Sequence, residues 1–239
     1  MRFIAGIAAF AIAAGTAAAD TVQMRFDHVG SGRNVRVSIG SQSFNCFAGQ
    51  LVHNFSGGTG AAGGLTGNLT TFCSDLTQEV SYTGATYTLT GIQNLPQSSG
   101  FAAMGDTKKQ AIYDMYAAAH GDQMGSNADM AAAFQLAIWE VIYDYDGTHT
   151  SSLSLGSGNL KVGNTSGGTL SSGVLACASL LFNAIGQNAA QVGLMGFRNG
   201  TYQDQILQTV SVVPLPTAGL AGMVGLGLVA YLKRRMKRS

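Results

Sequence analysis

The chain has 239 residues, of which 46% are hydrophobic and 10% charged, and its formal net charge at pH 7 is +1. Six of its thirteen Lys and Arg residues lie at the two ends, so residues 20–213 hold seven basic and twelve acidic residues, a net charge of −5. The frequent apolar residues exclude intrinsic disorder, and the negative charge of residues 20–213 removes the electrostatic support for nucleic-acid binding.

The first 19 residues predict a secretory signal. One basic residue precedes an apolar run, and small residues at Ala17 and Ala19 favour cleavage before Asp20. We therefore expect an exported protein in which residues 20–213 form one domain, long enough to bury a core.

Alternating apolar residues predict a β-rich first half of this domain. Residues 21–55 are expected to form two or three strands separated by GSGR and GSQS turns, and residues 69–76 and 80–92 two more strands. The glycine-rich stretch 56–68 is expected to be a flexible loop. It lacks the Gly-Lys-Ser or Gly-Lys-Thr sequence and the following helix of a phosphate-binding loop.

Helices are expected in the second half. Asp106 or Thr107 can cap a helix over residues 108–119, and Asn127 can cap a second helix that Gly147 ends.

A third helix is expected over residues 172–185, after a polar loop with a strand at 160–162. Residues 192–197 and 205–213 are expected to be the closing strands. The predicted fold class is α+β: a β-sandwich or barrel with a helical subdomain packed on it, flanked by an N-terminal signal helix and a C-terminal transmembrane helix.

The helix over FQLAIWEVIYDYDG, residues 134–147, has the strongest helical period in the chain. Its apolar stripe consists of Phe134, Ile138, Val141 and Tyr145, continued by Ile142 and Trp139. Gln135 falls between Ile142 and Trp139, where an unpartnered amide costs about 1–3 kcal/mol. A hydrogen bond to a neighbouring backbone is the ordinary explanation for such a residue. We expect Glu140 and Asp144 to form the solvated face of this helix.

A second segment, TFCSDLTQEVSYTGATYTL at residues 71–89, resembles together with this helix the thioester domains of bacterial surface adhesins. The matching residues are Phe72, Cys73 and Asp75 in the strand, and Phe134, Gln135, Ala137, Ile138 and Trp139 in the helix. The resemblance covers about residues 44–146. It implies an internal thioester between the Cys73 sulfur and the Gln135 side chain, with the other matching residues in supporting positions.

Such a bond forms when a thiolate attacks a carboxamide and expels ammonia, which requires the two groups about 3–3.5 Å apart. An amine can then capture the activated carbonyl, and a hydroxyl more slowly. Phe72, Phe134 and Trp139 are expected to keep water away from it. Because the linkage is consumed once, the chain is predicted to be a single-turnover covalent trap that needs no cofactor, and not an enzyme.

The three cysteines allow one disulfide and one remaining thiol in an oxidising compartment. The simplest assignment joins Cys46 to Cys177 and leaves Cys73 for Gln135. Connectivity cannot be deduced from sequence, so three free thiols, a disulfide at Cys73, or Cys46 as the nucleophile stay open.

The other chemical groups favour ordinary roles. The four histidines, His28, His53, His120 and His149, lack the spacing of a metal site, and no metal is expected. Asp144, Asp146 and Gly147 match only part of a calcium loop, so helix-end capping is favoured. Asp75 can orient its loop or polarise the thioester carbonyl, but a solvated carboxylate at a strand end is the commoner case.

The last segment, residues 214–239, begins with a proline-containing hinge. The apolar stretch from Ala218 to Leu232 rises only about 22 Å as a helix, which is short of a hydrocarbon core of about 30 Å. A basic tail starting at Lys233, Arg234 and Arg235 is expected to stay on the cytoplasmic side.

This order of parts resembles the carboxy-terminal signals recognised by exosortases (PEP-CTERM-like). The motif here consists of Val213, Pro214, Leu215, Pro216 and Thr217. The resemblance implies a precursor tethered to the inner membrane by its C-terminal helix, cleavage by an exosortase-type enzyme, and delivery to the surface or extracellular matrix of a Gram-negative bacterium. A simple tail anchor is the alternative.

The functional hypothesis is an exported surface or matrix protein whose Cys73–Gln135 thioester captures an amine-bearing target for adhesion. A non-covalent structural protein of the exopolysaccharide matrix is the first alternative. A thiol hydrolase using Cys73 and His120 is the second, although the flanking sequences of cysteine proteases are missing.

Overall fold

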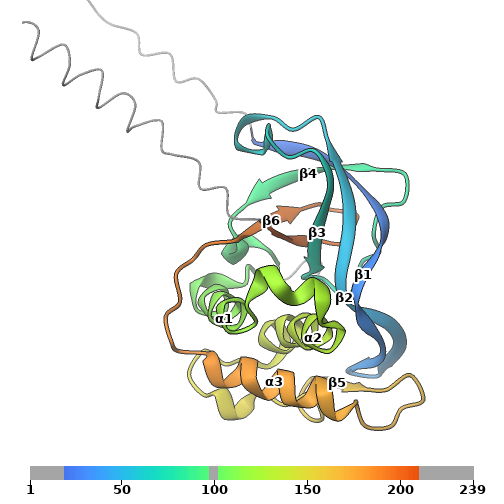
Figure 1. The fold of residues 1–239 in the computed structure, drawn as a ribbon, viewed down its shortest axis with the longest axis vertical. Helices are drawn as coiled ribbons and strands as arrows, with labels where there is room; N and C mark the ends of the chain where they lie inside the picture. The colour runs from blue at the N-terminus through green and yellow to red at the C-terminus, as the bar shows by residue number, and fades with distance from the viewer. Residues whose placement is uncertain (1–18, 97–101, 210–239) are drawn as a thin grey trace, which may run out of the picture. The chain divides into compact units, whose positions relative to one another are not determined.

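The computed structural model describes residues 19–96 and 102–209 (Figure 1). All but the last residue of the predicted signal peptide lies outside these residues, as do the sorting motif at Val213 to Thr217 and the apolar stretch that follows it. Of the helices within the described ranges, none has the length and apolar character needed to cross a membrane.

Seven strands form one antiparallel sheet, so the predicted α+β class is confirmed. Its order is β2-β3-β7-β6-β4-β1-β5, and β1 also pairs with β2, so six of the strands close into a ring and β5 continues from β1 outside it. The strands are β1 (Thr21–Ile39), β2 (Gln42–Ser56), β3 (Gly67–Cys73), β4 (Ala85–Thr90), β5 (Leu160–Gly163), β6 (Leu194–Arg198) and β7 (Gln205–Gln208).

Strand β1 is longer than predicted, because the GSGR sequence lies inside it and does not form a turn, whereas the GSQS turn separates β1 from β2 as expected. The register of β1 against β2 shifts between Phe26 and His28 and again between Val29 and Gly32. These irregularities bend the strand and keep it paired. Gly32 permits this close approach, because a Cβ atom there would lie 2.4 Å from the carbonyl oxygen of Ala48.

The shift divides the apolar residues of β1 between two cores. Val22 and Met24 lie in a small core within the ring of strands, whereas Val35 and Val37 belong to the larger core that contacts the helices. The small core consists of Val22, Met24, Phe55, Ala62, Tyr87, Phe197 and Leu207.

Three α-helices cover one side of the strands: α1 (Gly105–Ala118), α2 (Ala128–Asp144) and α3 (Ser172–Ala184). Helix α2 packs against β1, β2 and β5 on one side and against α1 and α3 on the other (Figure 1). The predicted cap is present, since the Asn127 side chain accepts a hydrogen bond from the Met130 N–H. By contrast, α1 begins at Gly105 without a side-chain cap. Short 3₁₀ helices are η1 (Gly60–Ala62), η2 (Ile92–Asn94), η3 (Gly121–Ser126) and η4 (Thr150–Ser152).

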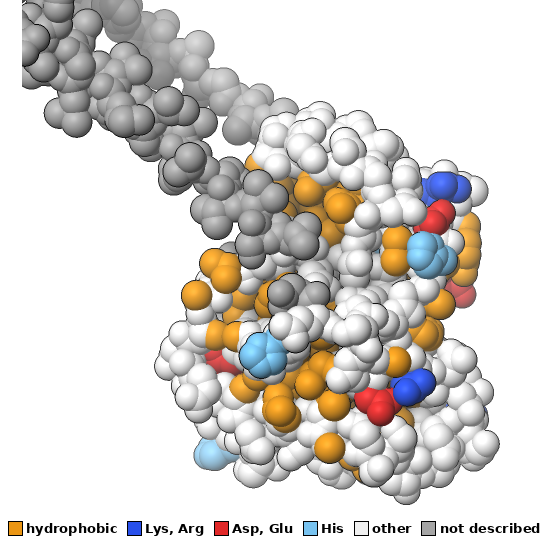
Figure 2. All heavy atoms as spheres, viewed as in Figure 1, with side chains coloured by type: hydrophobic (Ala, Val, Ile, Leu, Met, Phe, Trp, Pro, Cys, Tyr) orange, Lys and Arg blue, Asp and Glu red, His pale blue; other side chains and the backbone are white. Residues whose placement is uncertain are grey.

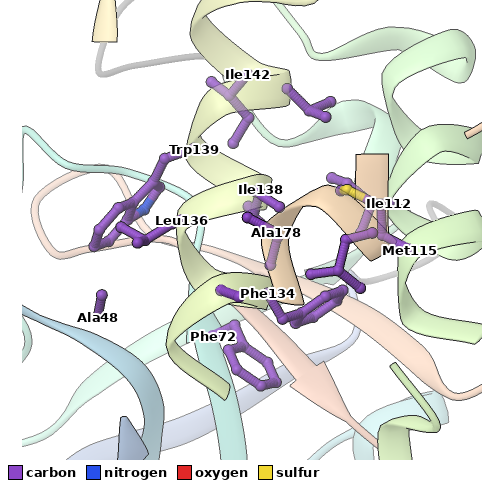
Figure 3. Packing of buried hydrophobic residues seen from close by; sticks show 14 of the residues in the cluster. Ala48, Phe72, Ile112, Met115, Phe134, Leu136, Ile138, Trp139, Ile142 and Ala178 are labelled. Carbon is purple, nitrogen blue, oxygen red and sulfur yellow. The ribbon is translucent and has the colours of Figure 1, made fainter. Parts of the chain in front are cut away.

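The larger core lies between the helices and the sheet (Figure 3). Helix α2 is buried on nearly all sides, including Phe134, Ile138 and Trp139. The end of β3 contributes Phe72 and Cys73 to the same core. The fold therefore places the last residues of β3 against the middle of α2.

Candidate functional site

The central feature of the site is a direct contact between Cys73, the last residue of β3, and Gln135 on α2. The Gln135 Oε1 atom accepts a hydrogen bond from the Cys73 backbone N–H at 2.8 Å, and Gln135 Nε2 donates to the Cys73 carbonyl oxygen at 2.7 Å. The two residues are 62 positions apart, and their exposed fractions are only 2% and 1%. The structure thus brings together the two residues that the sequence singles out.

The contact has a clear structural cause. The pairing of β2 with β3 ends at Thr71, two residues before Cys73. A glutamine carboxamide has the same donor and acceptor as a peptide group, so Gln135 continues the pairing where β2 stops. On the opposite edge of β3, Cys73 pairs with Gln205 of β7. The backbone of Cys73 is therefore held between a strand and a helix.

The Cys73 sulfur lies in a buried, largely aromatic environment. Its thiol donates a hydrogen bond to the backbone oxygen of Asp75 at 3.0 Å. The rings of Phe72 and Phe134, the residues that precede Cys73 and Gln135, meet edge to face with centroids 4.9 Å apart (Figure 3). Burial raises the pKa of the Cys73 thiol well above its ordinary value. The Trp139 indole N–H opposes that rise, although it makes no hydrogen bond of normal geometry.

Asp75 is fully buried, so the expectation of a solvated carboxylate at a strand end is wrong. Its Oδ1 atom accepts hydrogen bonds from the Thr77 backbone N–H and hydroxyl, both at 2.7 Å. With the Gln78 amide turned to satisfy its neighbours, Asp75 Oδ2 accepts from it at 3.1 Å. These bonds fix the turn after β3, and that turn presents the Asp75 carbonyl oxygen to the Cys73 thiol.

Glu140 was expected on a solvated face and is instead completely buried. The reason is that α2 is surrounded by other parts of the protein, so the spacing of its apolar residues does not identify a solvent-exposed face. Glu140 Oε1 accepts from the Ser154 backbone N–H at 2.7 Å, while Oε2 has no partner among the described residues. Burial raises the pKa of Glu140 to about 8. Asp144 is partly buried and accepts from the N–H groups of Asn159 and Leu160, which fixes the start of β5.

Two tyrosines lie beside the site: Tyr87, which belongs to the segment that resembles thioester domains, and Tyr143, which was not identified as a functional candidate from the sequence. Tyr143 and Tyr87 have buried hydroxyl oxygens without hydrogen-bond partners in the described part of the chain. Burial raises the pKa of both phenols, and the nearby Cys73 adds to the rise in each. The signal for Tyr143 was its spacing, because Gln135, Trp139 and Tyr143 follow one another at intervals of four residues on one face of α2.

Asp204 was also missed by the sequence analysis. It is buried at the start of β7, where Oδ1 accepts from the Asn199 N–H at 2.6 Å and its backbone oxygen accepts from the Ser74 N–H at 3.0 Å. Burial raises the pKa of Asp204 to about 7, and the Asp75 carboxylate adds to that rise.

All three cysteines have free thiols in the structure, so the predicted disulfide between Cys46 and Cys177 is not formed. Cys46 lies on β2 and Cys177 on α3, and α2 packs against both of these elements and separates them. Burial raises the pKa of Cys46 to about 11 and that of Cys73 in the same direction, so the contact of Cys73 with Gln135, and not its pKa, distinguishes the two thiols.

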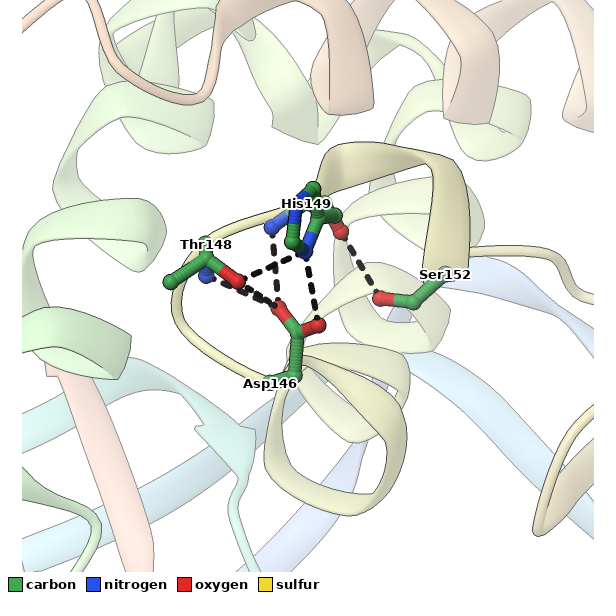
Figure 4. Close-up of polar contacts among 4 residues, drawn as sticks. All are labelled: Asp146, Thr148, His149 and Ser152. Atoms are coloured by element: carbon green, nitrogen blue, oxygen red, sulfur yellow. Dashed lines mark hydrogen bonds and ion pairs between the residues drawn. The ribbon is translucent and has the colours of Figure 1, made fainter.

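The remaining candidates make local contacts. Asp146 accepts from the backbone N–H groups of Thr148 and His149 at 2.8 and 2.9 Å, and the two side chains also contact its carboxylate (Figure 4). These bonds lower the pKa of Asp146 and cap the turn after α2, as the capping hypothesis expected. His53 is buried and bonds to the Thr71 hydroxyl at 2.9 Å. Across residues 19–96 and 102–209, no group of three or more His, Cys, Asp or Glu side chains is placed to hold a metal ion.

No protein-family model, curated protein or solved structure matches the chain. The residues around Cys73 and Gln135 and their geometry are therefore the observations that bear on function.

Proposed function

We propose that the chain is an exported surface or matrix protein in which Cys73 and Gln135 form an internal thioester that captures amine nucleophiles covalently. The main support is the pair of hydrogen bonds, 2.8 and 2.7 Å long, that hold the Gln135 carboxamide on the Cys73 backbone inside a buried site. A side chain held at both its oxygen and its nitrogen has lost most of the motion that an intramolecular reaction must overcome.

The first step would be attack of the Cys73 sulfur, as a thiolate, on the Gln135 carbonyl carbon. A carbon–sulfur bond forms, the carbon–nitrogen bond of the carboxamide breaks, and the nitrogen leaves as ammonia with the proton from the thiol. The Cys73 N–H already donates to Gln135 Oε1, so it can stabilise the negative charge that develops on this oxygen.

In the second step, an amine from the target attacks the thioester carbonyl. An amide bond forms between the target nitrogen and the Gln135 carbonyl carbon, and the sulfur leaves as a thiolate that takes up the amine proton. Burial raises the pKa of this sulfur, and the Trp139 indole N–H opposes that rise, which favours departure of the thiolate. The burial of Cys73 and Gln135 would limit the access of water, which otherwise hydrolyses the bond.

The proposed location follows from the two ends of the sequence. Residues 1–19 would direct export, and cleavage near Pro214 by an exosortase-type enzyme would release the protein from its membrane-tethered precursor. The reactive site would then be carried by a β-barrel with a helical subdomain at the cell surface or in the matrix. Its partner would be an amine-bearing molecule there.

One observation favours a second candidate, a non-covalent structural protein of the extracellular matrix. The Gln135 amide is fully satisfied by the Cys73 backbone, and the Cys73 thiol by the Asp75 carbonyl oxygen. A purely structural glutamine at the end of a strand would make the same bonds.

Intact-mass measurement of the exported protein separates the two candidates. The thioester predicts a mass lower than that of the sequence by one molecule of ammonia, and methylamine should add to the protein with release of one thiol. Cys73→Ala and Gln135→Ala should each show the full mass calculated from their sequences, whereas the matched variant Cys177→Ala should still show the loss of ammonia.

The full mass in the wild-type protein, purified under mild conditions without nucleophiles, would exclude the thioester. A tryptic peptide containing Cys73 joined to one containing Gln135 would locate the bond directly.

A further inference from the structure

A groove of about 440 Å³ lies between the end of β1, the short strand β5, the chain that flanks β5 and the start of α3, and neither Cys73 nor Gln135 lines it. Its polar lining includes Arg36, Ser38, Lys161 and Thr169, and its apolar lining includes Leu155 and Leu175. Figure 1 shows β5 beside β1 at the helical side of the molecule. The groove volume falls within the range of small-molecule sites, about 300–1,000 Å³.

The strand register places the polar residues on one face. Ser38 pairs with Lys161 and Arg36 pairs with Gly163, so all four positions point to the same side of the two strands. The alternate residues Val37 and Leu160 are fully buried on the opposite side. At Gly163 the backbone of Gly168 approaches the strand closely, because a Cβ atom there would lie 2.5 Å from the Gly168 carbonyl oxygen.

The two cations of this groove differ from Arg25, Arg33 and Lys109. Arg25, Arg33 and Lys109 each pair with an aspartate within 4 Å, whereas Arg36 and Lys161 form no ion pair with any described residue. On the face seen in Figure 2, basic side chains likewise lie beside acidic ones.

The groove is also free of acidic residues. None of the residues that line the groove is Asp or Glu. The positive charge of Arg36 and Lys161 is therefore not cancelled within the groove, although residues 20–213 carry a net charge of −5.

We propose that this groove binds the carboxylate of an acidic sugar. The Arg36 guanidinium offers a planar pair of donors that matches a carboxylate, and Lys161 adds a second cation. The hydroxyls of Ser38 and Thr169 can bond to sugar hydroxyls, while Leu155 and Leu175 provide apolar surface for the C–H groups of the ring. The lining contains no aromatic ring on which a nucleobase could stack, which argues against a nucleotide.

Calorimetric titration of the exported protein at low ionic strength tests this site, with glucuronate and a short polyuronate as probes and glucose and inorganic sulfate as controls. Both uronates should bind, and binding should weaken as salt is added. Equal affinity per unit for glucuronate and polyuronate would identify a free sugar acid as the ligand. An affinity that rises with chain length would identify an acidic polysaccharide.

The double variant Arg36→Gln/Lys161→Gln should lose affinity for uronate by a factor of about ten or more, because it removes both charge-assisted contacts. The matched variant Arg25→Gln/Lys109→Gln removes the same charges elsewhere and should bind normally. Circular dichroism checks that both variants fold. Equal losses in the two variants, binding of sulfate as tight as that of glucuronate, or no uronate binding at all would overturn the proposal.

The site does not depend on the thioester. Gln135→Ala cannot form that bond, and it should bind uronate like the wild-type protein. Failure of one proposal therefore leaves the other standing.

Discussion

The side chain of Gln135 pairs with the end of β3 in place of a neighbouring strand. Its carboxamide supplies one acceptor and one donor to the Cys73 backbone, at 2.8 and 2.7 Å, where β2 no longer pairs with β3. A buried peptide group without these partners would cost about 1–3 kcal/mol for each unpaired atom. The same two bonds that stabilise the strand end also set the carboxamide beside the cysteine, so structure and chemistry at this residue have a common origin.

Glu140 makes stability depend on pH at the residue scale. Its pKa is about 8 in the folded protein and 4.5 as an ordinary side chain. Between these values the unfolded chain has lost the proton that the folded protein keeps, so the free energy of unfolding should fall as pH rises through this window. Asp204, with a pKa raised to about 7, should act in the same direction.

Urea denaturation at several pH values between 5 and 8 checks this prediction. Glu140→Gln removes the titrating group while keeping an acceptor for the Ser154 N–H, so its stability should decline less steeply with pH than that of the wild-type protein. Identical slopes for the two proteins would show that Glu140 does not keep its proton on folding.

Helix α2 and strand β1 show at the scale of elements what the sequence could and could not predict. Alternation and capping residues located most of the strands and all three α-helices. They failed at GSGR, because a turn sequence and a bulged strand use the same small residues. They failed again at Glu140, because a helical period shows an apolar stripe but cannot show that the chain at Ser154 covers the opposite side of the helix.

The candidate site was predictable only in part. Cys73 and Gln135 were identified through a resemblance that joins two motifs, since no local pattern reports a contact between residues 62 positions apart. Tyr143 and Asp204 were missed because their burial depends on how α2 and β7 meet the end of β3. The Cys46–Cys177 pairing was wrong because cysteine counting takes no account of the intervening helix.

The bulge in β1 offers a test at this scale. Gly32→Ala would place a Cβ atom 2.4 Å from the Ala48 carbonyl oxygen and 2.8 Å from the Gly49 Cα atom. Relief of this overlap must move backbone, so we expect a loss of about 1–3 kcal/mol in the free energy of unfolding. The control is Gly200→Ala, where a Cβ atom would meet no neighbouring atom within 4 Å. Equal stability of both variants in urea would show that β1 and β2 are not closely packed at Gly32.

At the scale of the whole molecule, closure of the ring depends on β7, which pairs with both β3 and β6. A chain of residues 20–203 lacks this strand, the Cys73–Gln205 pairing and the bond from the Ser74 N–H to Asp204. We expect it to lose cooperative unfolding, whereas a chain of residues 20–209 should retain it.

The single tryptophan, Trp139, is buried in α2 and reports this difference by its fluorescence during urea titration. Cooperative unfolding of the shorter chain with an unchanged midpoint would show that the ring does not need β7. The longer chain ends before Pro214, so it also shows whether removal of the proposed sorting segment leaves the fold intact.

Ring closure also bears on self-association. Strands with unpaired edges recruit strands of other molecules and so promote aggregation. Here the last strand in the sheet order is β5, which has only four residues and includes the exposed Lys161. A short strand with an exposed lysine is a poor template for an intermolecular β-sheet. We therefore expect this protein not to aggregate through the edge of its sheet, even at high local concentration.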